Sequence, residues 1–206
     1  MAEMSARTDQ ARSLLDVATD EARHVRREGF RALLGGQSVD VEELSSRSGL
    51  GVDAIRLALS ELESKGLARV DAAGRLVGAA GLSVVPSPHR LELDGRVFHT
   101  WCALDAVGIP AALEADARAM TTCPLCGRTM ELDIRAGRPV NFPKAVIWLP
   151  SKSCSSVADE LCPDMNLFCD ERHLREWSSQ SGDPAGQSLS LREAADLGRE
   201  WWTEIR

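Results

Sequence analysis

The chain has 206 residues, 44% of them hydrophobic, enough to bury a core in one domain or in a small domain joined to a larger one. Its formal net charge of −7 argues against nucleic acid or an anionic membrane as the main partner. The sequence has no apolar stretch near 18 residues, and residues 1–10 lack the apolar centre of a secretory signal. We therefore expect a cytoplasmic protein whose six cysteines are ligands, catalytic groups or buried thiols rather than disulfides.

Three helices are predicted in the first third of the chain. The first covers about residues 8–34 and the third about residues 52–65, each with apolar residues every three or four positions and glycine directly after its end. The second begins at Asp40, whose side chain can cap it while Glu43 reaches back as in a capping box, and it ends near Gly49.

A short hairpin of strands at 67–70 and 75–77 follows, and three helices and a hairpin in this order resemble a winged helix-turn-helix. Lysine and arginine supply most of the affinity for phosphates, which makes the charge of the would-be recognition helix informative. This helix carries a formal charge of −1, from Asp53, Glu61 and Glu63 against Arg56 and Lys65. We therefore expect the unit to have a structural or interaction role rather than a DNA-binding one.

Residues 81–88 are rich in small residues and prolines, which is typical of a boundary. We predict a helical, winged-helix-like domain at residues 1–80 and a catalytic domain at residues 81–206. The expected fold class is α+β, in which the second domain has a mixed or antiparallel sheet with flanking helices.

A tight hairpin is predicted at the start of the second domain. Strands at 89–93 and 96–100 flank Asp94 and Gly95, a dipeptide that favours a two-residue turn. The second strand leads directly into Cys102.

The rest of the chain is predicted to mix strands and helices. Pro110 either limits the helix after Cys102 or begins a new one at 111–114. Ser190 and Glu193 have the spacing of a capping box and open the last helix. The remaining predicted elements are strands at 130–134 and 145–149 and helices at 170–178 and 190–204.

Cys102 and Asp105 are expected on one face of a helix, close to its start, because residues three apart share a face. The positive end of the helix dipole favours the thiolate, and a carboxyl one turn on can carry a proton to or from whatever the sulfur holds. The plainer interpretation makes Cys102 a buried apolar group and Asp105 a surface carboxylate. We expect Phe98 and Trp101 to pack in the core rather than contact a ligand, and His99 to be a satisfied polar group.

Three segments carry a family resemblance. They are the run Val97–Asp105 (VFHTWCALD), Cys162 with the Asn-Leu-Phe at 166–168, and the Glu-Ala-Ala-Asp-Leu-Gly at 193–198. In order and spacing these resemble organomercurial (alkylmercury) lyase, over about residues 30–206. The Trp-Cys-Ala-Leu-Asp run is the most specific part.

The resemblance implies cleavage of a carbon–mercury bond by protonolysis, with Cys102, Asp105 and Cys162 as the catalytic and mercury-binding residues. Two soft thiolates bind mercury and push electron density toward the carbon, which then needs only a proton to leave. Hg(II) would stay on the cysteines until a small thiol or an acceptor protein such as a mercuric reductase removes it. No organic cofactor is expected, because protonolysis moves no electrons.

A second group of cysteines is not explained by this chemistry. Cys123 and Cys126 form a Cys-x-x-Cys knuckle, which is half of a structural zinc site. Cys154 and Cys169 can complete it, although their spacing is not that of a second knuckle. The resemblance favours Cys123 as a buried structural thiol, and paired exposed thiols can also act as a relay for Hg(II).

Two further functions stay open at this point. One is a soft-metal-binding regulator whose front domain contacts DNA, against which the acidic recognition helix argues. The other is a divergent enzyme on the same scaffold that uses Cys102 and Asp105 on another substrate.

Overall fold

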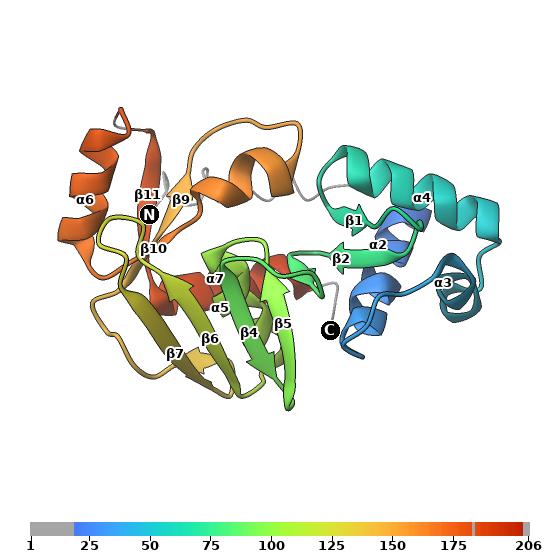
Figure 1. The fold of residues 1–206 in the computed structure, drawn as a ribbon, viewed down its shortest axis with the longest axis horizontal. Helices are drawn as coiled ribbons and strands as arrows, with labels where there is room; N and C mark the ends of the chain where they lie inside the picture. The colour runs from blue at the N-terminus through green and yellow to red at the C-terminus, as the bar shows by residue number, and fades with distance from the viewer. Residues whose placement is uncertain (1–18, 183, 204–206) are drawn as a thin grey trace.

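The computed structural model describes residues 19–182 and 184–203, which form an α+β fold built on a mostly antiparallel sheet, as predicted (Figure 1). Within these ranges no helix has the length and apolar character needed to cross a membrane. The helices are α2 (Asp20–Leu33), α3 (Val41–Ser48), α4 (Val52–Ser64), α5 (Ala103–Leu113), the π-helical η1 (Val157–Leu161), the 3-10 helix η2 (Cys162–Asp164), α6 (Glu171–Gln180) and α7 (Leu191–Trp201). The strands are β1 (Ala68–Val70), β2 (Leu76–Ala79), β3 (Leu82–Ser83), β4 (His89–Leu93), β5 (Arg96–Thr100), β6 (Ala117–Thr122), β7 (Thr129–Arg135), β8 (Arg138–Pro139), β9 (Val146–Pro150), β10 (Leu167–Phe168) and β11 (Gly186–Ser190).

The larger sheet has eight strands in the order β1-β2-β3-β5-β4-β6-β7-β8, and neighbouring strands in it pair antiparallel. A smaller sheet has the order β10-β9-β11. Helices α5 and α7 pack against each other behind the larger sheet, and α5 contacts β4, β5 and β6 (Figure 1). Strand β5 leads directly into α5, and the start of this helix is buried, with Cys102 and Ala103 each 1% exposed.

The N-terminal helices end and begin near where the sequence predicts. Asp40 caps α3 by accepting a hydrogen bond from the backbone N–H of Glu43 at 2.7 Å. The Glu43 side chain, however, pairs with Arg47 at 2.9 Å instead of reaching back as in a capping box. Gly49 ends α3 with a φ of 72°. Of the first predicted helix, residues 8–18 lie outside the described ranges, and the described part is α2.

The hairpin before Cys102 agrees with its prediction, whereas α5 differs from its own. Strands β4 and β5 have the expected bounds, and Asp94 and Gly95 both adopt positive φ in the turn between them. Helix α5 continues through Pro110 without a break. Ten of its eleven residues are buried, and the burial of this apolar segment outweighs the hydrogen bond that proline cannot donate.

Five strands have no counterpart in the prediction: β3, β6, β8, β10 and β11. Four of them contain two to five residues, too few to show an alternating pattern, and β6 (ARAMTT) lacks large β-formers. Strand β3 lies in the stretch predicted as a boundary and pairs with both β2 and β5. The larger sheet therefore continues from the N-terminal hairpin into the rest of the molecule.

Helices α5 and α7 cross at two glycines. A methyl group on Gly198 would lie 2.3 Å from the Cα of Gly108, and one on Gly108 would lie 2.8 Å from the Trp202 ring. Only hydrogen fits between the two backbones at this crossing, so Gly108 and Gly198 set the distance between the helices.

We expect Gly198→Ala to lower the free energy of unfolding by about 1–3 kcal/mol, because the added methyl must push α5 and α7 apart. Urea denaturation measures the change. Gly51→Ala is the matched control, since nothing lies within 4 Å of the methyl added there. Equal stability of the two variants would contradict close packing at the crossing.

Candidate active site

Cys102 and Asp105 cap the start of α5 for each other. The backbone N–H of Cys102 donates to Oδ2 of Asp105 at 2.9 Å, and the backbone N–H of Asp105 donates to Sγ of Cys102 at 3.4 Å. This is a capping box in which a cysteine replaces the usual serine or threonine. Thr100, at the end of β5, donates from its hydroxyl to the Cys102 carbonyl at 2.9 Å. The turn from strand to helix thus fixes both side chains.

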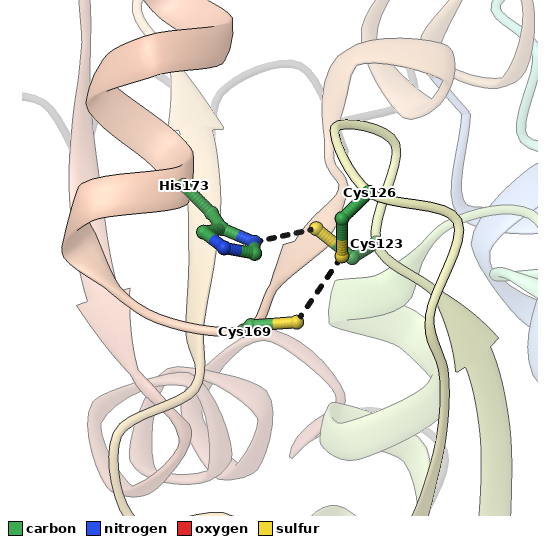
Figure 2. A group of neighbouring side chains, drawn as sticks. All are labelled: Cys123, Cys126, Cys169 and His173. Atoms are coloured by element: carbon green, nitrogen blue, oxygen red, sulfur yellow. Dashed lines mark hydrogen bonds between the residues drawn. The ribbon is translucent and has the colours of Figure 1, made fainter.

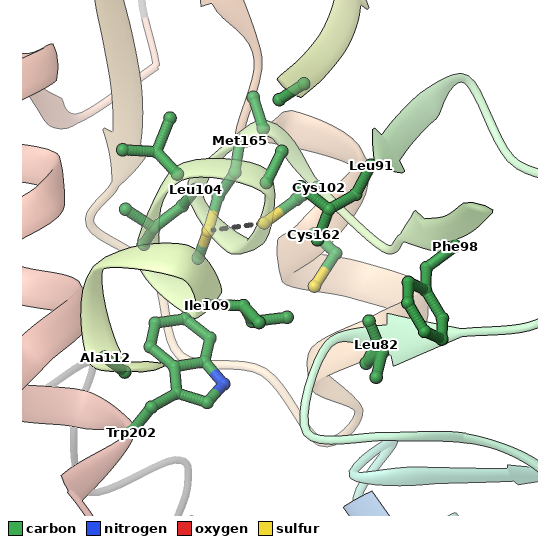
Figure 3. Close-up of a cluster of buried hydrophobic side chains, with 14 of the residues drawn as sticks. Leu82, Leu91, Phe98, Cys102, Leu104, Ile109, Ala112, Cys162, Met165 and Trp202 are labelled. Carbon is green, nitrogen blue, oxygen red and sulfur yellow. Dashed lines mark hydrogen bonds between the residues drawn. The ribbon is translucent and has the colours of Figure 1, made fainter. Parts of the chain in front are cut away.

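Cys162 reaches the same place from the segment between β9 and β10. It lies where the π-helical η1 changes into the 3-10 helix η2, and the 3-10 turn brings Met165 beside Cys102 (Figure 3). The backbone N–H of Ala103 donates to the Met165 carbonyl at 3.0 Å. Sγ of Cys102 lies 3.6 Å from Sδ of Met165. These contacts join the segment to the start of α5.

The three predicted site residues therefore meet, and we call them the buried triad: Cys102, Asp105 and Cys162. Their two sulfurs and a carboxylate oxygen all lie within 4.8 Å of one another. The residues are only 1%, 5% and 3% exposed, respectively. A group of this size and composition suits a soft metal held by sulfur, with a carboxyl beside it.

Burial keeps both thiols of the triad protonated at neutral pH. It raises the pKa of Cys102 well above its usual range, and the neighbouring Cys162 and Asp105 raise it further. A hydrogen bond from Cys102 lowers the pKa of Cys162, but burial and the Asp105 carboxyl outweigh it and the net direction is upward. The sequence suggested that the helix dipole would favour the Cys102 thiolate; the loss of solvation is the larger effect here.

Asp105 is held between its two protonation states near neutral pH. Burial raises its pKa to about 7, although the Cys102 side chain and the backbone N–H groups of Cys102 and Trp101 stabilise the carboxylate. A carboxyl with this pKa can accept a proton and give it back with little cost in either direction.

A largely apolar cavity of about 40 Å³ opens onto the triad at Asp105 and Cys162. Trp101 lines it and packs, partly buried, against the core, as the sequence suggested. Trp202 also lines it and donates from its indole N–H to the Ala80 carbonyl at 2.7 Å. The other lining residues are Arg26, Leu67, Ala80, Gly81, Val157 and Trp201.

The N-terminal unit contacts the segment that carries Cys162. The backbone N–H of Val157 donates to the Lys65 carbonyl at 2.9 Å, and Arg69 pairs with Asp159. A methyl group on Gly66 would lie 2.7 Å from the Ala158 nitrogen, so the two backbone segments are in close contact there. Hydrogen bonds and an ion pair thus attach η1 to the end of α4 and to β1.

The two remaining residues of the predicted motif have packing and polar roles. Phe98 is 1% exposed in the core, as expected. His99 accepts a hydrogen bond at Nδ1 from the backbone N–H of Ser87 at 3.0 Å and is a satisfied polar group, also as expected.

A second group of ligand-type side chains lies at the turn between β6 and β7 and at the start of α6 (Figure 2). We call it the knuckle cluster, and its members are Cys123, Cys126, Cys169 and His173. Their ligand atoms also lie within 4.8 Å of one another. Cys154 is not among them, so the structure does not bring together the four cysteines considered from the sequence. His173 takes its place, and the signal for it was the Cys-x-x-x-His spacing from Cys169.

Two cysteines of the knuckle cluster, Cys123 and Cys169, have opposite pKa shifts. Burial raises the pKa of Cys123, but the contact with His173 and three backbone N–H groups outweigh it and lower the value to about 6. Burial and the sulfurs of Cys126 and Cys123 raise the pKa of Cys169 to about 12. The Cys123 thiolate is thus favoured while the Cys169 thiol stays protonated.

Comparison with known proteins identifies the family. The family model for MerB, alkylmercury lyase, matches residues 82–203. The chain belongs to the alkylmercury lyase family. It is 29% identical to an alkylmercury lyase of Bacillus cereus over 177 residues, which covers 82% of this chain and 78% of the relative. It is 32% identical to an alkylmercury lyase of Pseudomonas putida over 172 residues, with the same coverage of both chains.

The fold agrees with this assignment. The crystal structure of the mercury-bound form of MerB2 superposes with a TM-score of 0.88 and 23% identity, covering 97% of this chain and 98% of that one. The protein is therefore an enzyme that cleaves carbon–mercury bonds, and the family and activity predicted from the sequence are confirmed.

Gly81 was missed as a site residue, because its small neighbours were interpreted as a boundary. It has a φ of 88°, and a methyl group on it would lie 2.5 Å from Oδ1 of Asp105. Its carbonyl accepts a hydrogen bond from the backbone N–H of Trp101 at 3.0 Å. The glycine therefore allows the chain before β3 to pass directly over the carboxyl.

We expect Gly81→Ala to lower the cleavage rate of phenylmercury at least about tenfold, because the methyl displaces the Asp105 carboxyl, which the sequence predicts to be the proton carrier. Gly74→Ala is the control: it has a φ of 78° with nothing within 4 Å of the added methyl. It should cost roughly 1 kcal/mol of stability from backbone strain and leave turnover unchanged. Turnover and urea unfolding of both variants measure the two effects. Equal turnover would mean that the contact with Asp105 has no bearing on the reaction.

Proposed function

We propose that the buried triad carries out the carbon–mercury cleavage, with Cys102 and Cys162 as mercury ligands and Asp105 as the proton carrier. The observation that carries the proposal is the meeting of two buried sulfurs and one carboxyl oxygen within 4.8 Å. In the described part of the chain the only other group of this kind is the knuckle cluster, which has no carboxyl.

The protons balance if both thiols begin neutral. One thiol gives up its proton as its sulfur replaces the original ligand of the organomercurial cation R–Hg⁺, and this proton leaves with that ligand. The other thiol passes its proton to the Asp105 carboxylate as its sulfur binds mercury. The carbon–mercury electron pair then takes the proton from Asp105, and R–H leaves. Hg(II) stays bound to two thiolates.

The protein environment supports each of these steps. Two thiolates on mercury push electron density toward the carbon, and soft sulfur selects a soft metal. The pKa of Asp105, about 7, suits a group that must take a proton from sulfur and release it to carbon. The capping bonds to Cys102 keep the carboxyl beside the sulfur, so little reorganisation is needed.

The apolar cavity is the proposed site of the organic group. The Trp101 ring and the Leu67 and Val157 side chains offer a surface that water solvates poorly, which favours an alkyl or aryl substituent. We infer that Trp202, held by its bond to the Ala80 carbonyl, forms a fixed wall. We propose that Hg(II) stays bound as the product and that the reaction uses no organic cofactor.

We further propose that residues 1–80 are a winged-helix-like unit that serves the active site and that residues 81–206 are the catalytic unit. The contacts of Lys65 and Arg69 with η1, and the place of Arg26 in the cavity wall, support this role. The acidic helix α4 argues against DNA as its partner. The continuous larger sheet gives the two units a shared element.

Small thiols and a protein acceptor such as a mercuric reductase are proposed to take Hg(II) from the triad. Thiolates exchange soft metals readily, so an incoming thiol can replace Cys162 and then Cys102. A cytoplasmic location stays a prediction from cysteine usage: all six cysteines are free.

Replacing any member of the triad should abolish turnover. We expect Cys102→Ser, Cys162→Ser and Asp105→Asn each to lower benzene release from phenylmercury, in excess small thiol, by at least about a hundredfold. Cys154→Ser is the control, because this cysteine belongs to neither ligand group. Full turnover in any triad variant would overturn the role given to that residue.

The Asp105→Asn variant should also test whether the loss is chemical. A carboxyl with a raised folded-state pKa contributes stability below its unfolded value, and this contribution is lost as pH rises through about 7. Asparagine stays neutral, so the variant should be at least as stable as the parent at pH 8 by urea unfolding. Unfolding of the variant at pH 8 would point to a structural role instead.

The pH dependence of kcat/KM should reveal the ionisation of Asp105. Below pH 7 the carboxyl is increasingly protonated and cannot accept the thiol proton. We expect kcat/KM to fall about tenfold per pH unit below a midpoint near 7. Phenylmercury turnover from pH 5 to pH 8, with circular dichroism to verify folding, measures this. A flat profile, or a midpoint near 4, would contradict the proposed proton carrier.

A further inference from the structure

The knuckle cluster lies outside the buried triad and takes no part in the proposed reaction. Two of its members come from the turn between β6 and β7, in the run Cys-Pro-Leu-Cys-Gly at 123–127. The other two come from the junction between β10 and α6. In Figure 2 the four side chains point toward one common centre from these two segments. This arrangement suits a metal ion that is bound by several sulfur atoms.

Two distances within the cluster match a tetrahedral metal site, and all four ligand atoms lie within 4.8 Å of one another. A zinc ion with Zn–S bonds of about 2.3 Å and a Zn–N bond of about 2.0 Å requires S···S edges of about 3.8 Å and S···N edges of about 3.5 Å. Sγ of Cys126 lies 3.7 Å from Sγ of Cys169. Sγ of Cys123 lies 3.6 Å from Nδ1 of His173. These are two opposite edges of the tetrahedron, each with the length expected for its atom types.

Backbone hydrogen bonds hold both segments in the conformations that carry the four side chains. The knuckle turn closes with hydrogen bonds from the Gly127 N–H to the Cys123 carbonyl and from the Cys123 N–H to the Arg128 carbonyl, both at 2.9 Å. Gly127 has a φ of 70° at the position after the second cysteine. In the other segment Asp170 caps α6 by accepting from the His173 N–H at 2.9 Å. The cap places His173 in the first turn of the helix.

We propose that the knuckle cluster is a four-coordinate structural zinc site. Three thiolates and one imidazole are a common ligand set for structural zinc, and the spacings Cys-x-x-Cys and Cys-x-x-x-His fit it. With the metal on Nδ1, the proton of His173 lies on Nε2. The exposed Arg172 side chain, whose guanidinium is 2.9 Å from Nε2, then turns toward solvent.

The zinc ion would join the turn between β6 and β7 to the start of α6. Cys169 follows β10 and lies seven residues after Cys162. The metal would therefore hold the C-terminal side of the segment that carries Cys162, while the N-terminal unit holds its other side through Val157 and Asp159. Its effect on the reaction would be to position Cys162 rather than to contact the substrate.

Metal analysis of the purified full-length protein tests this site directly. We expect about one zinc per chain by elemental analysis, retained after gel filtration. Cys126→Ser should lose this zinc, and because Cys126 is exposed the variant should still fold. Cys154→Ser is the matched control and should keep it. Cys102→Ser should keep it too, which separates this site from the buried triad.

Cobalt substitution gives a second measurement that does not depend on activity. Co(II) bound by three thiolates and an imidazole in a tetrahedral site should give strong visible ligand-field bands. Cys126→Ser should remove these bands, whereas Cys154→Ser should not. Removal of zinc by a chelator should also lower the thermal midpoint of the parent, and should leave that of Cys126→Ser unchanged.

Three results would overturn the proposal. The first is a parent protein that holds no zinc after reduction and incubation with one equivalent of Zn(II). The second is zinc that is lost in Cys102→Ser and kept in Cys126→Ser. The third is a parent protein that does not bind zinc but binds a second equivalent of Hg(II), when Cys126→Ser does not bind this second equivalent. That result would make the cluster a thiol relay.

Discussion

The structure of the active site depends on one pair of hydrogen bonds, those by which Cys102 and Asp105 cap α5 for each other. A cap normally lies at the surface and satisfies N–H groups that water would otherwise solvate. Here the cap is buried, so the hydrogen bonds that begin the helix also hold a carboxyl and a thiol together away from water. The same hydrogen bonds thus begin the helix and bring the proposed reactive pair together, so a change that shifts the start of α5 would also change the proposed site.

The third reactive group depends on tertiary contacts instead. Cys162 lies in a segment of π- and 3-10-helical turns, which have poorer internal hydrogen bonding than an α-helix. Such a segment needs support from its surroundings. The N-terminal unit supplies it through the Lys65 carbonyl and Arg69, and α5 supplies it through the contact between Ala103 and Met165. If Cys162 is a mercury ligand as proposed, the N-terminal helices would therefore be a structural requirement of catalysis.

Turns and helix caps that have a local sequence signal could be predicted from the sequence. The Asp94-Gly95 turn, the Asp40 cap and the Ser190/Glu193 capping box are all present in the structure. The triad residues were named from a family motif, and their meeting in space depends on pairing and packing that no local pattern contains. The short strands have too few residues to show a pattern. The knuckle-cluster position of His173 and the close approach of Gly81 to Asp105 were missed for another reason. Each depends on a partner distant in sequence. The prediction at Pro110 was wrong because burial of the apolar segment lets α5 continue through the proline.

The protonated resting state of the triad has a consequence for the life of the enzyme in a cell. Peroxides and disulfides react with thiolates, so two buried neutral thiols are poor targets for oxidation while the enzyme waits for substrate. Abundant borderline metals gain little from such a site, since binding must first expel protons from sulfur. Mercury is soft enough to make that exchange favourable. The same burial that disfavours ionisation would thus act as a filter, which keeps the two proposed mercury ligands unreactive toward common oxidants and ions.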